Sequence, residues 1–181
     1  MLTSTAGSQL NIHTSDRFLP TGVPHVTMLY PFWGMPRGGR QRPEIFDQFI
    51  RKGMDLFSLG SPKDADFFLL PFDWRYTSLE FAETEREALQ AKIEAQRFSD
   101  LANDLNKKLI VFFVSDSDAE VSLENALVFR TSLRRDLRPN EFAMAVFIDD
   151  FLGERLGSDL PLRPKLQCPS VGFCGFAGYR T

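Results

Sequence analysis

Four short segments of this 181-residue chain, each at the end of an apolar run, together supply acidic, guanidinium and aromatic side chains. A carboxylate accepts protons, a guanidinium group binds hydroxyl or phosphate oxygens, and an aromatic ring stacks on the apolar face of a sugar. Such a combination predicts carbohydrate recognition with a proton acceptor nearby. The segments are residues 30–34, 71–76, 115–118 and 130–132.

The acidic members of these segments are the candidate catalytic residues. Asp73 and Asp116 each stand immediately beyond an apolar run, where a general base for an acceptor hydroxyl is expected. The alternative for both is the common structural role of an aspartate in a turn, which is to bond its own backbone.

The aromatic and basic members are the candidate acceptor-binding residues. Trp33 and Trp74 offer ring faces for stacking on a sugar, and Arg75 and Arg130 offer planar donors for hydroxyls or an acidic sugar. The alternative for the two tryptophans is that they seal the top of the core, because large aromatic side chains are mostly buried.

No metal cofactor is predicted, although one segment leaves the question open. Asp116 and Asp118 flank Ser117 in an Asp-x-Asp arrangement, in which two carboxylates can share Mg²⁺ or Mn²⁺. The same residues also fit a plain turn with a helix N-cap. His13 and His25 have no histidine or cysteine at ligand spacing, so neither is expected to bind metal.

The elements that position these residues follow from five apolar runs that are continuous rather than alternating. Such strands are covered on both faces, which is typical of a parallel sheet. Helical patterns separate the first three runs, so we predict an α/β fold, a Rossmann-like doubly wound parallel sheet whose carboxyl edge gathers the four segments. The expected strands are residues 25–30, 66–72, 109–114, 126–131 and 170–176.

Two helices are predicted between these strands. The first covers residues 43–57, with Pro43 in its first turn, and the second covers residues 79–106, with Ser78 as N-cap. Both carry apolar residues at helical spacing, so each should cover one face of the sheet.

Composition and charge limit the function classes. The formal net charge of −3 offers no basic field for nucleic-acid phosphates, so nucleic acid is an unexpected partner. No window approaches a membrane span and the N-terminus lacks a signal-peptide pattern, so a cytoplasmic location is expected. Cys168 and Cys174 fit neither a disulfide framework nor a zinc site, and we expect both to be reduced.

The domain boundaries follow from the prolines near the end of the chain. Residues 1–24 are expected to be an N-terminal extension, residues 25–158 a Rossmann-like domain and residues 159–169 a proline-rich connector. Residues 170–181 are expected to form a strand entering a glycine-rich bend, which would either open a second domain or close a single one.

Three stretches resemble bacterial members of the exostosin family. In residues 64–72 an Ala-Asp pair precedes an apolar strand ending in Pro-Phe, as in that family. Residues 125–133 followed by 140–144, and the Val-Gly-Phe-Cys-Gly stretch within 165–176, are similar to it as well.

The resemblance implies one half of a GT-B enzyme, an inverting glycosyltransferase of two Rossmann-like domains that acts in polysaccharide biosynthesis. This chain would hold the glycan acceptor, and a missing C-terminal domain would hold the nucleotide-sugar donor. Gly172 and Gly175 would then allow close approach of the donor phosphates, and the isolated chain would be inactive. The alternatives are a non-catalytic flavodoxin-like module and a module that binds glycan without turnover.

Overall fold

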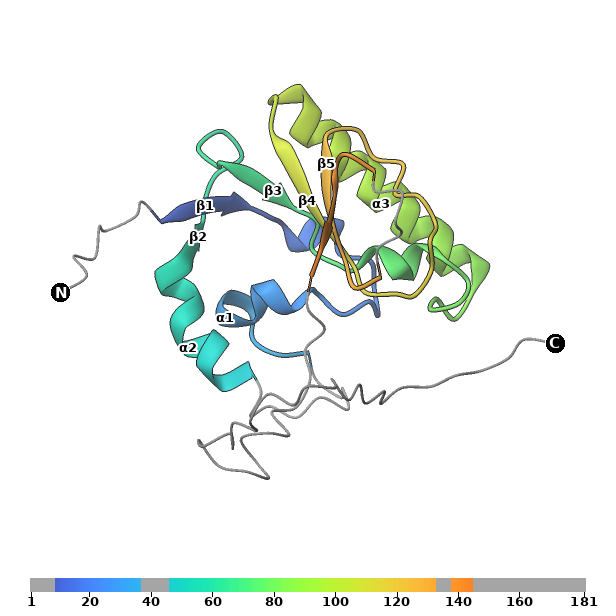
Figure 1. Ribbon diagram of the computed structural model, residues 1–181, viewed down its shortest axis with the longest axis horizontal. Coiled ribbons are helices and arrows are strands. Elements are labelled where there is room, and N and C mark those ends of the chain that lie inside the picture. The colour runs from blue at the N-terminus through green and yellow to red at the C-terminus, as the bar shows by residue number, and fades with distance from the viewer. Residues whose placement is uncertain (1–8, 37–45, 133–137, 145–181) are drawn as a thin grey trace, which may run out of the picture. The chain divides into compact units, whose positions relative to one another are not determined.

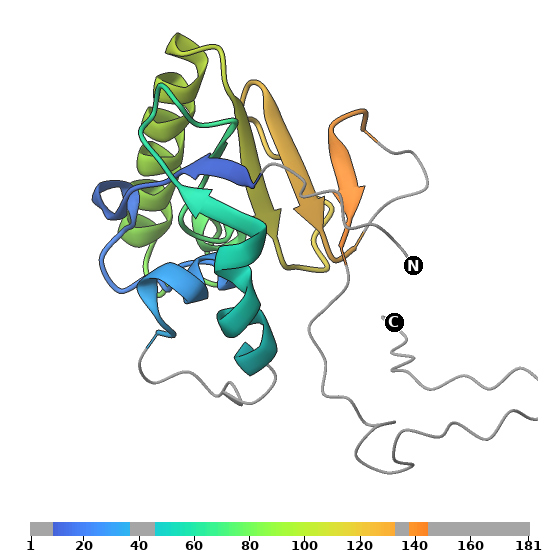
Figure 2. The same cartoon turned by 90° about the vertical axis from the view of Figure 1, so that its left-hand side faces the viewer.

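A six-stranded parallel sheet with helices on both faces forms the core of the computed structural model, which describes residues 9–36, 46–132 and 138–144. The strand order is β2-β1-β3-β4-β5-β6 (Figure 1). Figure 2 shows β6 at the edge of the sheet, with the arrows of β4, β5 and β6 pointing the same way. The strands are β1 (Leu10–His13), β2 (Phe57–Leu59), β3 (Phe67–Leu69), β4 (Lys108–Phe113), β5 (Ala126–Arg130) and β6 (Glu141–Ala143).

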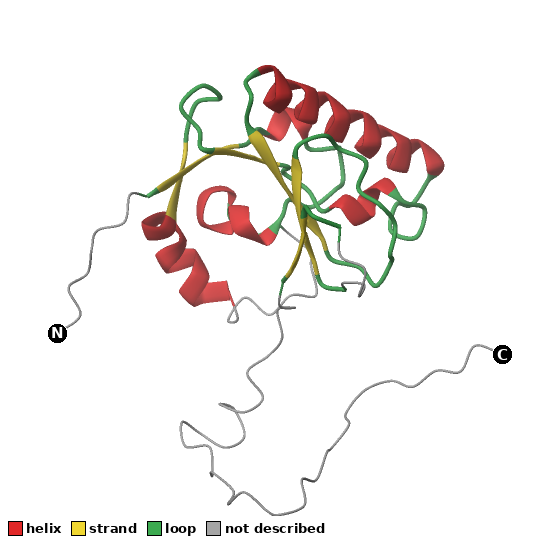
Figure 3. Ribbon diagram, turned by 45° about the horizontal axis from the view of Figure 1, so that its top comes forward, coloured by secondary structure: helices red, strands yellow, loops and turns green. Residues whose placement is uncertain are grey.

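The helices lie in two layers, as Figure 3 shows. The long helix α3 packs on one face of the sheet, and α1 and α2 pack on the other, together with the short 3₁₀ helix η2. The helices are α1 (Tyr30–Trp33), α2 (Asp47–Leu56) and α3 (Glu85–Asp104), with 3₁₀ helices η1 (Asp16–Phe18), η2 (Thr27–Leu29) and η4 (Trp74–Thr77).

Alternation along the strands divides the core between these layers. In β4, Leu109, Val111 and Phe113 face α3, whereas Ile110 and Phe112 face the layer of α1 and α2. Strands with both faces covered read as continuous apolar runs, which is why three of them are predictable from sequence. The predicted α/β fold with a parallel sheet is therefore confirmed.

The beginning of α3 differs from the prediction. Thr84, not Ser78, is the N-cap: its hydroxyl accepts from the N–H of Glu87, and the Glu87 carboxylate accepts from the N–H of Thr84. Ser78 instead follows η4, where its hydroxyl donates to the carbonyl of Arg75. The helix predicted over residues 43–57 corresponds to α2; Pro43 lies outside the described residues.

The predicted strand at residues 25–30 is wrong. Only His25 forms an isolated bridge, with Phe72, and the chain then turns through η2 into α1. Pro31 is favourable in the first turn of a helix and lacks the N–H that a continuing strand needs, so the apolar run packs as helical turns.

The first strand instead lies inside the expected N-terminal extension. β1 pairs with β2 on one side and with β3 on the other, and Ile12 is completely buried. From residue 9 onward the segment assigned to residues 1–24 is therefore part of the folded domain. The predicted strand at 170–176 and the connector at 159–169 lie outside the described residues.

Candidate functional site

The strand order locates a topological switch point between β1 and β3. The chain passes from β1 to β2 on one side and then returns to β3 on the other side of β1. In open parallel sheets, ligands bind outside the carboxyl ends of the strands at such a point. The segments that follow β1, β3 and β4 are therefore the first place to look for a site.

Three of the four predicted segments meet at this edge. The segment after β3 contacts the segment after β4 through Asp73 and the N–H of Val114. The segment after β4 contacts the segment after β5 twice: the Thr131 hydroxyl donates to the carbonyl of Ser115 at 3.3 Å, and the Ser132 hydroxyl donates to Asp116 at 2.8 Å. The predicted convergence therefore holds for these three segments.

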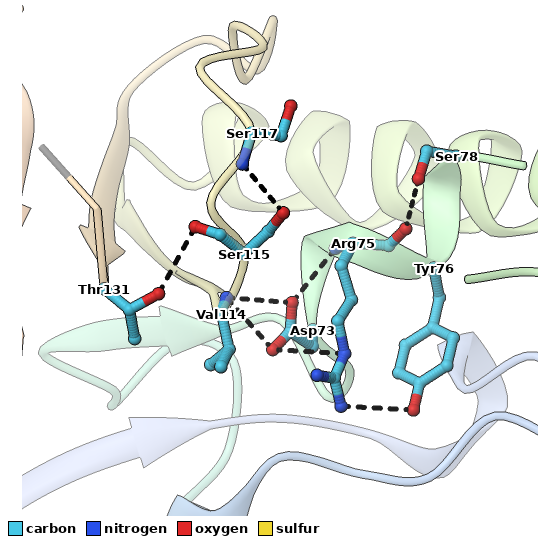
Figure 4. A network of polar contacts seen from close by, with 8 residues as sticks. All are labelled: Asp73, Arg75, Tyr76, Ser78, Val114, Ser115, Ser117 and Thr131. Atoms are coloured by element: carbon cyan, nitrogen blue, oxygen red, sulfur yellow. Dashed lines mark hydrogen bonds and ion pairs between the residues drawn. The ribbon is translucent and has the colours of Figure 1, made fainter. Parts of the chain in front are cut away.

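Asp73 lies at the centre of this junction (Figure 4). It is 7% exposed, its Oδ1 accepts the N–H of Arg75 at 3.0 Å, and both its oxygens accept the N–H of Val114 at 3.2 Å. Desolvation by burial raises the pKa of Asp73 above its ordinary value of 3.8, against the opposing effects of these amides and of the Arg75 charge. The turn role weighed for Asp73 is thus present, and the same carboxylate is also a stronger base than an exposed one.

Arg75 lies beside this carboxylate and is partly accessible. Its Nε is 3.9 Å from Oδ2 of Asp73, which is too long for a hydrogen bond, and among the described residues this nitrogen is buried with no hydrogen-bond partner. Nη2 donates to the Tyr76 hydroxyl at 3.3 Å, and the guanidinium group stacks over the rings of Tyr76 and Phe81. These aromatic contacts hold the guanidinium group next to Asp73.

A cavity of about 540 Å³ opens beside Asp73 and Arg75, on the face of the sheet that α1 and α2 cover. Its lining includes a polar region formed by Asp73, Arg75 and Tyr76, which contact one another, and the polar residues His25 and Thr27. The remaining wall is mainly apolar, and its large members are Met28, Phe46, Phe49, Leu56, Phe57 and Phe112.

The segment around His25 reaches this cavity although it is not a strand. The N–H of Val26 donates to the carbonyl of Pro71 at 2.9 Å, which places residues 25–26 beside the end of β3. Nε2 of His25 is 2.7 Å from the carbonyl oxygen of Gly34, and Trp33 packs edge-on against the imidazole ring. Trp33 thus supports His25 and is not part of the cavity lining.

Arg130 has internal contacts only. Its side chain is 2% exposed, Nη1 is 2.6 Å from the Glu141 carboxylate, and Nη2 donates to the carbonyls of Ser117 and Ala119. The guanidinium group also lies over the Phe113 ring. It holds β6 and the segment after β4 against β5, and the acceptor-binding role predicted for it is not retained.

The remaining predicted site residues are less central. Trp74 is buried in the core beneath α3, as its alternative interpretation anticipated. Asp116 is exposed and lines neither this cavity nor the one described next. Among the described residues, no group of three or more His, Cys, Asp and Glu side chains is arranged to hold a metal ion. Gly172 and Gly175 lie outside the described residues.

A second cavity, of about 570 Å³, lies on the α3 side of the junction. It is bounded by η4, the first turns of α3 and the segment after β4, and its lining includes Ser115, Ser117 and Ser122. Arg75 lines both cavities. Because the switch point and the Asp73 carboxylate belong to the first cavity, that cavity is the stronger candidate site.

Sequence reasoning misses His25, Tyr76 and Phe112 as parts of the site. It places His25 at the entry of a strand and Phe112 in a strand interior. The period of two along β4 does separate Phe112 from Val111 and Phe113, but nothing in the sequence reveals that its face is incompletely covered.

Comparisons of this chain with protein-family models, curated proteins and solved structures found no match. The resemblance to the exostosin family therefore stays a prediction. Within the part of the chain that the structure describes, no helix has the length and apolar character needed to cross a bilayer.

Proposed function

We propose that this chain is the acceptor-side domain of an inverting glycosyltransferase and that Asp73 is its general base. The observation that carries the proposal is the position of Asp73: a buried carboxylate with a raised pKa, at the switch point of a parallel sheet, in the wall of a cavity large enough for a small molecule. The exostosin resemblance of residues 64–72, which lead directly to Asp73, points to the same chemistry.

In the proposed reaction an acceptor hydroxyl attacks the anomeric carbon of a nucleotide sugar. The new bond forms between the acceptor oxygen and that carbon, the bond to the diphosphate oxygen breaks, and the hydroxyl proton passes to the Asp73 carboxylate. Burial of Asp73 favours this transfer because it raises the affinity of the carboxylate for a proton. Arg75, 3.9 Å away, would orient the hydroxyl by donating to its oxygen.

The donor half of the reaction follows from the resemblance alone. Gly172 and Gly175 would approach the diphosphate, with no metal required, and the domain to which they belong would complete the enzyme. A cytoplasmic location, where nucleotide sugars are made, is part of the same proposal.

The experiment is a transfer assay of the complete protein that contains this chain and the proposed donor domain, with UDP-, GDP- and CMP-sugars and a panel of glycan acceptors. Product mass and nucleotide release are measured together. Asp73→Asn should lower turnover at least about a hundredfold, the usual contribution of a general base. Asp116→Asn is the control, because Asp116 follows the neighbouring strand and lines neither cavity. Equal turnover of the two variants would contradict the assignment.

A second candidate function is a non-catalytic module that binds a small molecule in the same cavity. The strand order β2-β1-β3-β4-β5 favours it, because this is the order of flavodoxin-like sheets, whereas the Rossmann order begins 3-2-1-4. Ligand binding in this cavity with no nucleotide release from any donor would support the module over the transferase.

A further inference from the structure

We infer that the cavity beside Asp73 binds a neutral amphiphile, that is, a molecule with hydroxyl groups at one end and an alkyl or aromatic group at the other. This deepens the proposed function, on which it rests for the identity of the acceptor, because it names the acceptor as a glycoside with an apolar aglycone.

The lining of the cavity combines a polar region with apolar side chains. Asp73, Arg75 and Tyr76 contact one another and form the polar region, whereas Phe49 of α2 and Phe112 of β4 are among the apolar members of the wall. A free sugar would leave that apolar wall in contact with water. An alkyl chain or ring attached to the sugar would cover it, and each buried methylene contributes to affinity.

The polar region formed by Asp73, Arg75 and Tyr76 should bind a hydroxyl group more favourably than an anion. Asp73 and Arg75 are a carboxylate acceptor and a guanidinium donor side by side, with Nε of Arg75 and Oδ2 of Asp73 only 3.9 Å apart. A hydroxyl can donate to the first and accept from the second, and the Nε of Arg75 has no hydrogen-bond partner among the described residues. An anionic group would be repelled by the Asp73 carboxylate, and the positive charge of Arg75 is already balanced by that carboxylate.

The size of the cavity agrees with this class of ligand. A volume of about 540 Å³ falls within the range of small-molecule sites and exceeds what one sugar ring needs. The aromatic side chains that face the cavity come from separate elements, Phe49 from α2 and Phe112 from β4, so the wall is part of the folded core and not a single loop.

The test measures the equilibrium binding of octyl β-D-glucoside by calorimetry, at concentrations below its critical micelle concentration. Methyl β-D-glucoside lacks the apolar group, and octanesulfonate carries the same chain on an anion. We expect octyl glucoside to bind at least about tenfold more tightly than either, because only it offers both hydroxyls for the polar region and an alkyl chain for the apolar wall. Equal affinity for methyl glucoside, equal affinity for octanesulfonate, or no binding of octyl glucoside would each overturn the inference.

Two variants of α2 locate the binding site. Leu56 lines the cavity and is 62% exposed, whereas Met54 is 53% exposed on the same helix and does not line it. Both side chains are on the surface, so Leu56→Glu and Met54→Glu should both fold. Octyl glucoside should bind Leu56→Glu at least about tenfold more weakly and Met54→Glu as the wild type. Equal weakening in both, or in neither, would contradict the assignment.

The outcomes separate this inference from the proposed function. Binding is measured without a donor, so octyl glucoside that binds but is never glycosylated leaves the inference standing and removes the transferase. Transfer to a free glycan without any binding of octyl glucoside would overturn the inference and leave the proposed transferase standing.

Discussion

The Asp73 carboxylate accepts the N–H of Val114 with both oxygens, at 3.2 Å each, across 41 positions of the chain. This contact joins the carboxyl ends of β3 and β4 next to the cavity. Asp73 is therefore a structural residue of the junction and, in the proposed function, its reactive group as well.

The pH dependence of stability tests the burial of Asp73. Desolvation raises its pKa above 3.8, so the folded state holds the proton more tightly than the unfolded state. The stabilising contribution is then fully present below about pH 3.8 and is lost as the pH rises through the folded-state pKa.

Asp73→Asn provides the reference for this measurement, because it cannot titrate. We expect the free energy of unfolding of the wild type, relative to that of the variant, to fall in urea titrations as the pH rises above 3.8 and through the raised pKa of Asp73. A difference that stays constant or rises with pH would show that amide hydrogen bonds outweigh desolvation at this carboxylate.

The buried ion pair of Arg130 and Glu141 should dominate the stability of the β5–β6 edge. Arg130→Met leaves the Glu141 carboxylate buried with one fewer partner, and we expect the free energy of unfolding to fall by about 3 kcal/mol. Arg138→Met is the matched control. Arg138 contacts the same carboxylate from a side chain that is 33% exposed. Its loss should therefore cost under about 1 kcal/mol. Similar losses in chemical denaturation would contradict the internal role of Arg130.

The N-cap of α3 can be tested against the residue that the sequence suggests. Thr84→Ala removes the hydroxyl that accepts from the N–H of Glu87 and should lower stability by about 1 kcal/mol. Ser78→Ala removes a hydroxyl on an exposed residue outside the helix. This second change should alter stability by less than about 0.5 kcal/mol. Thermal and urea unfolding of both variants decide between Thr84 and Ser78.

Gly53 in α2 gives a prediction in which two effects have opposite signs. Helix propensity alone predicts that Gly53→Ala stabilises the helix by about 1 kcal/mol. A Cβ at this position would overlap the ring of Pro31 in α1, so we expect a net loss of stability in urea unfolding. Lys52 is one residue away and exposed. Lys52→Ala should therefore stay within about 0.5 kcal/mol of wild type. A stabilised Gly53→Ala variant would mean that α1 and α2 pack less closely than described.

The sheet is predictable where both faces are buried and not elsewhere. β3, β4 and β5 read as continuous apolar runs, and α3 has an unbroken helical pattern. β1 escapes prediction because it is short and half polar. Asn11 Nδ2 donates to the carbonyl of Asp64, and Nδ1 of His13 is 2.9 Å from the carbonyl of Gly60, contacts that no local pattern reveals.

The site is predictable as an edge of the sheet but not as a set of contacts. That Asp73 follows β3 is visible in the sequence; that it accepts the N–H of Val114 depends on strand register. The burial of Arg130 has a usable signal, because Ala126, Val128 and Arg130 alternate along β5 and so share the face that packs beneath α3. On its charge alone, Arg130 is nevertheless predicted to bind the acceptor, and that prediction does not use this alternation.

The position of β1 between β2 and β3 has a consequence for synthesis on the ribosome. Leu10 is translated before its partner Phe57, and Ile12 is translated before its partner Phe67. One edge of β1 therefore stays unpaired in the nascent chain until β2 has left the exit tunnel, and the other edge stays unpaired until β3 has done so. A deletion that removes β1 would separate the edge strand β2 from the other four strands of the sheet.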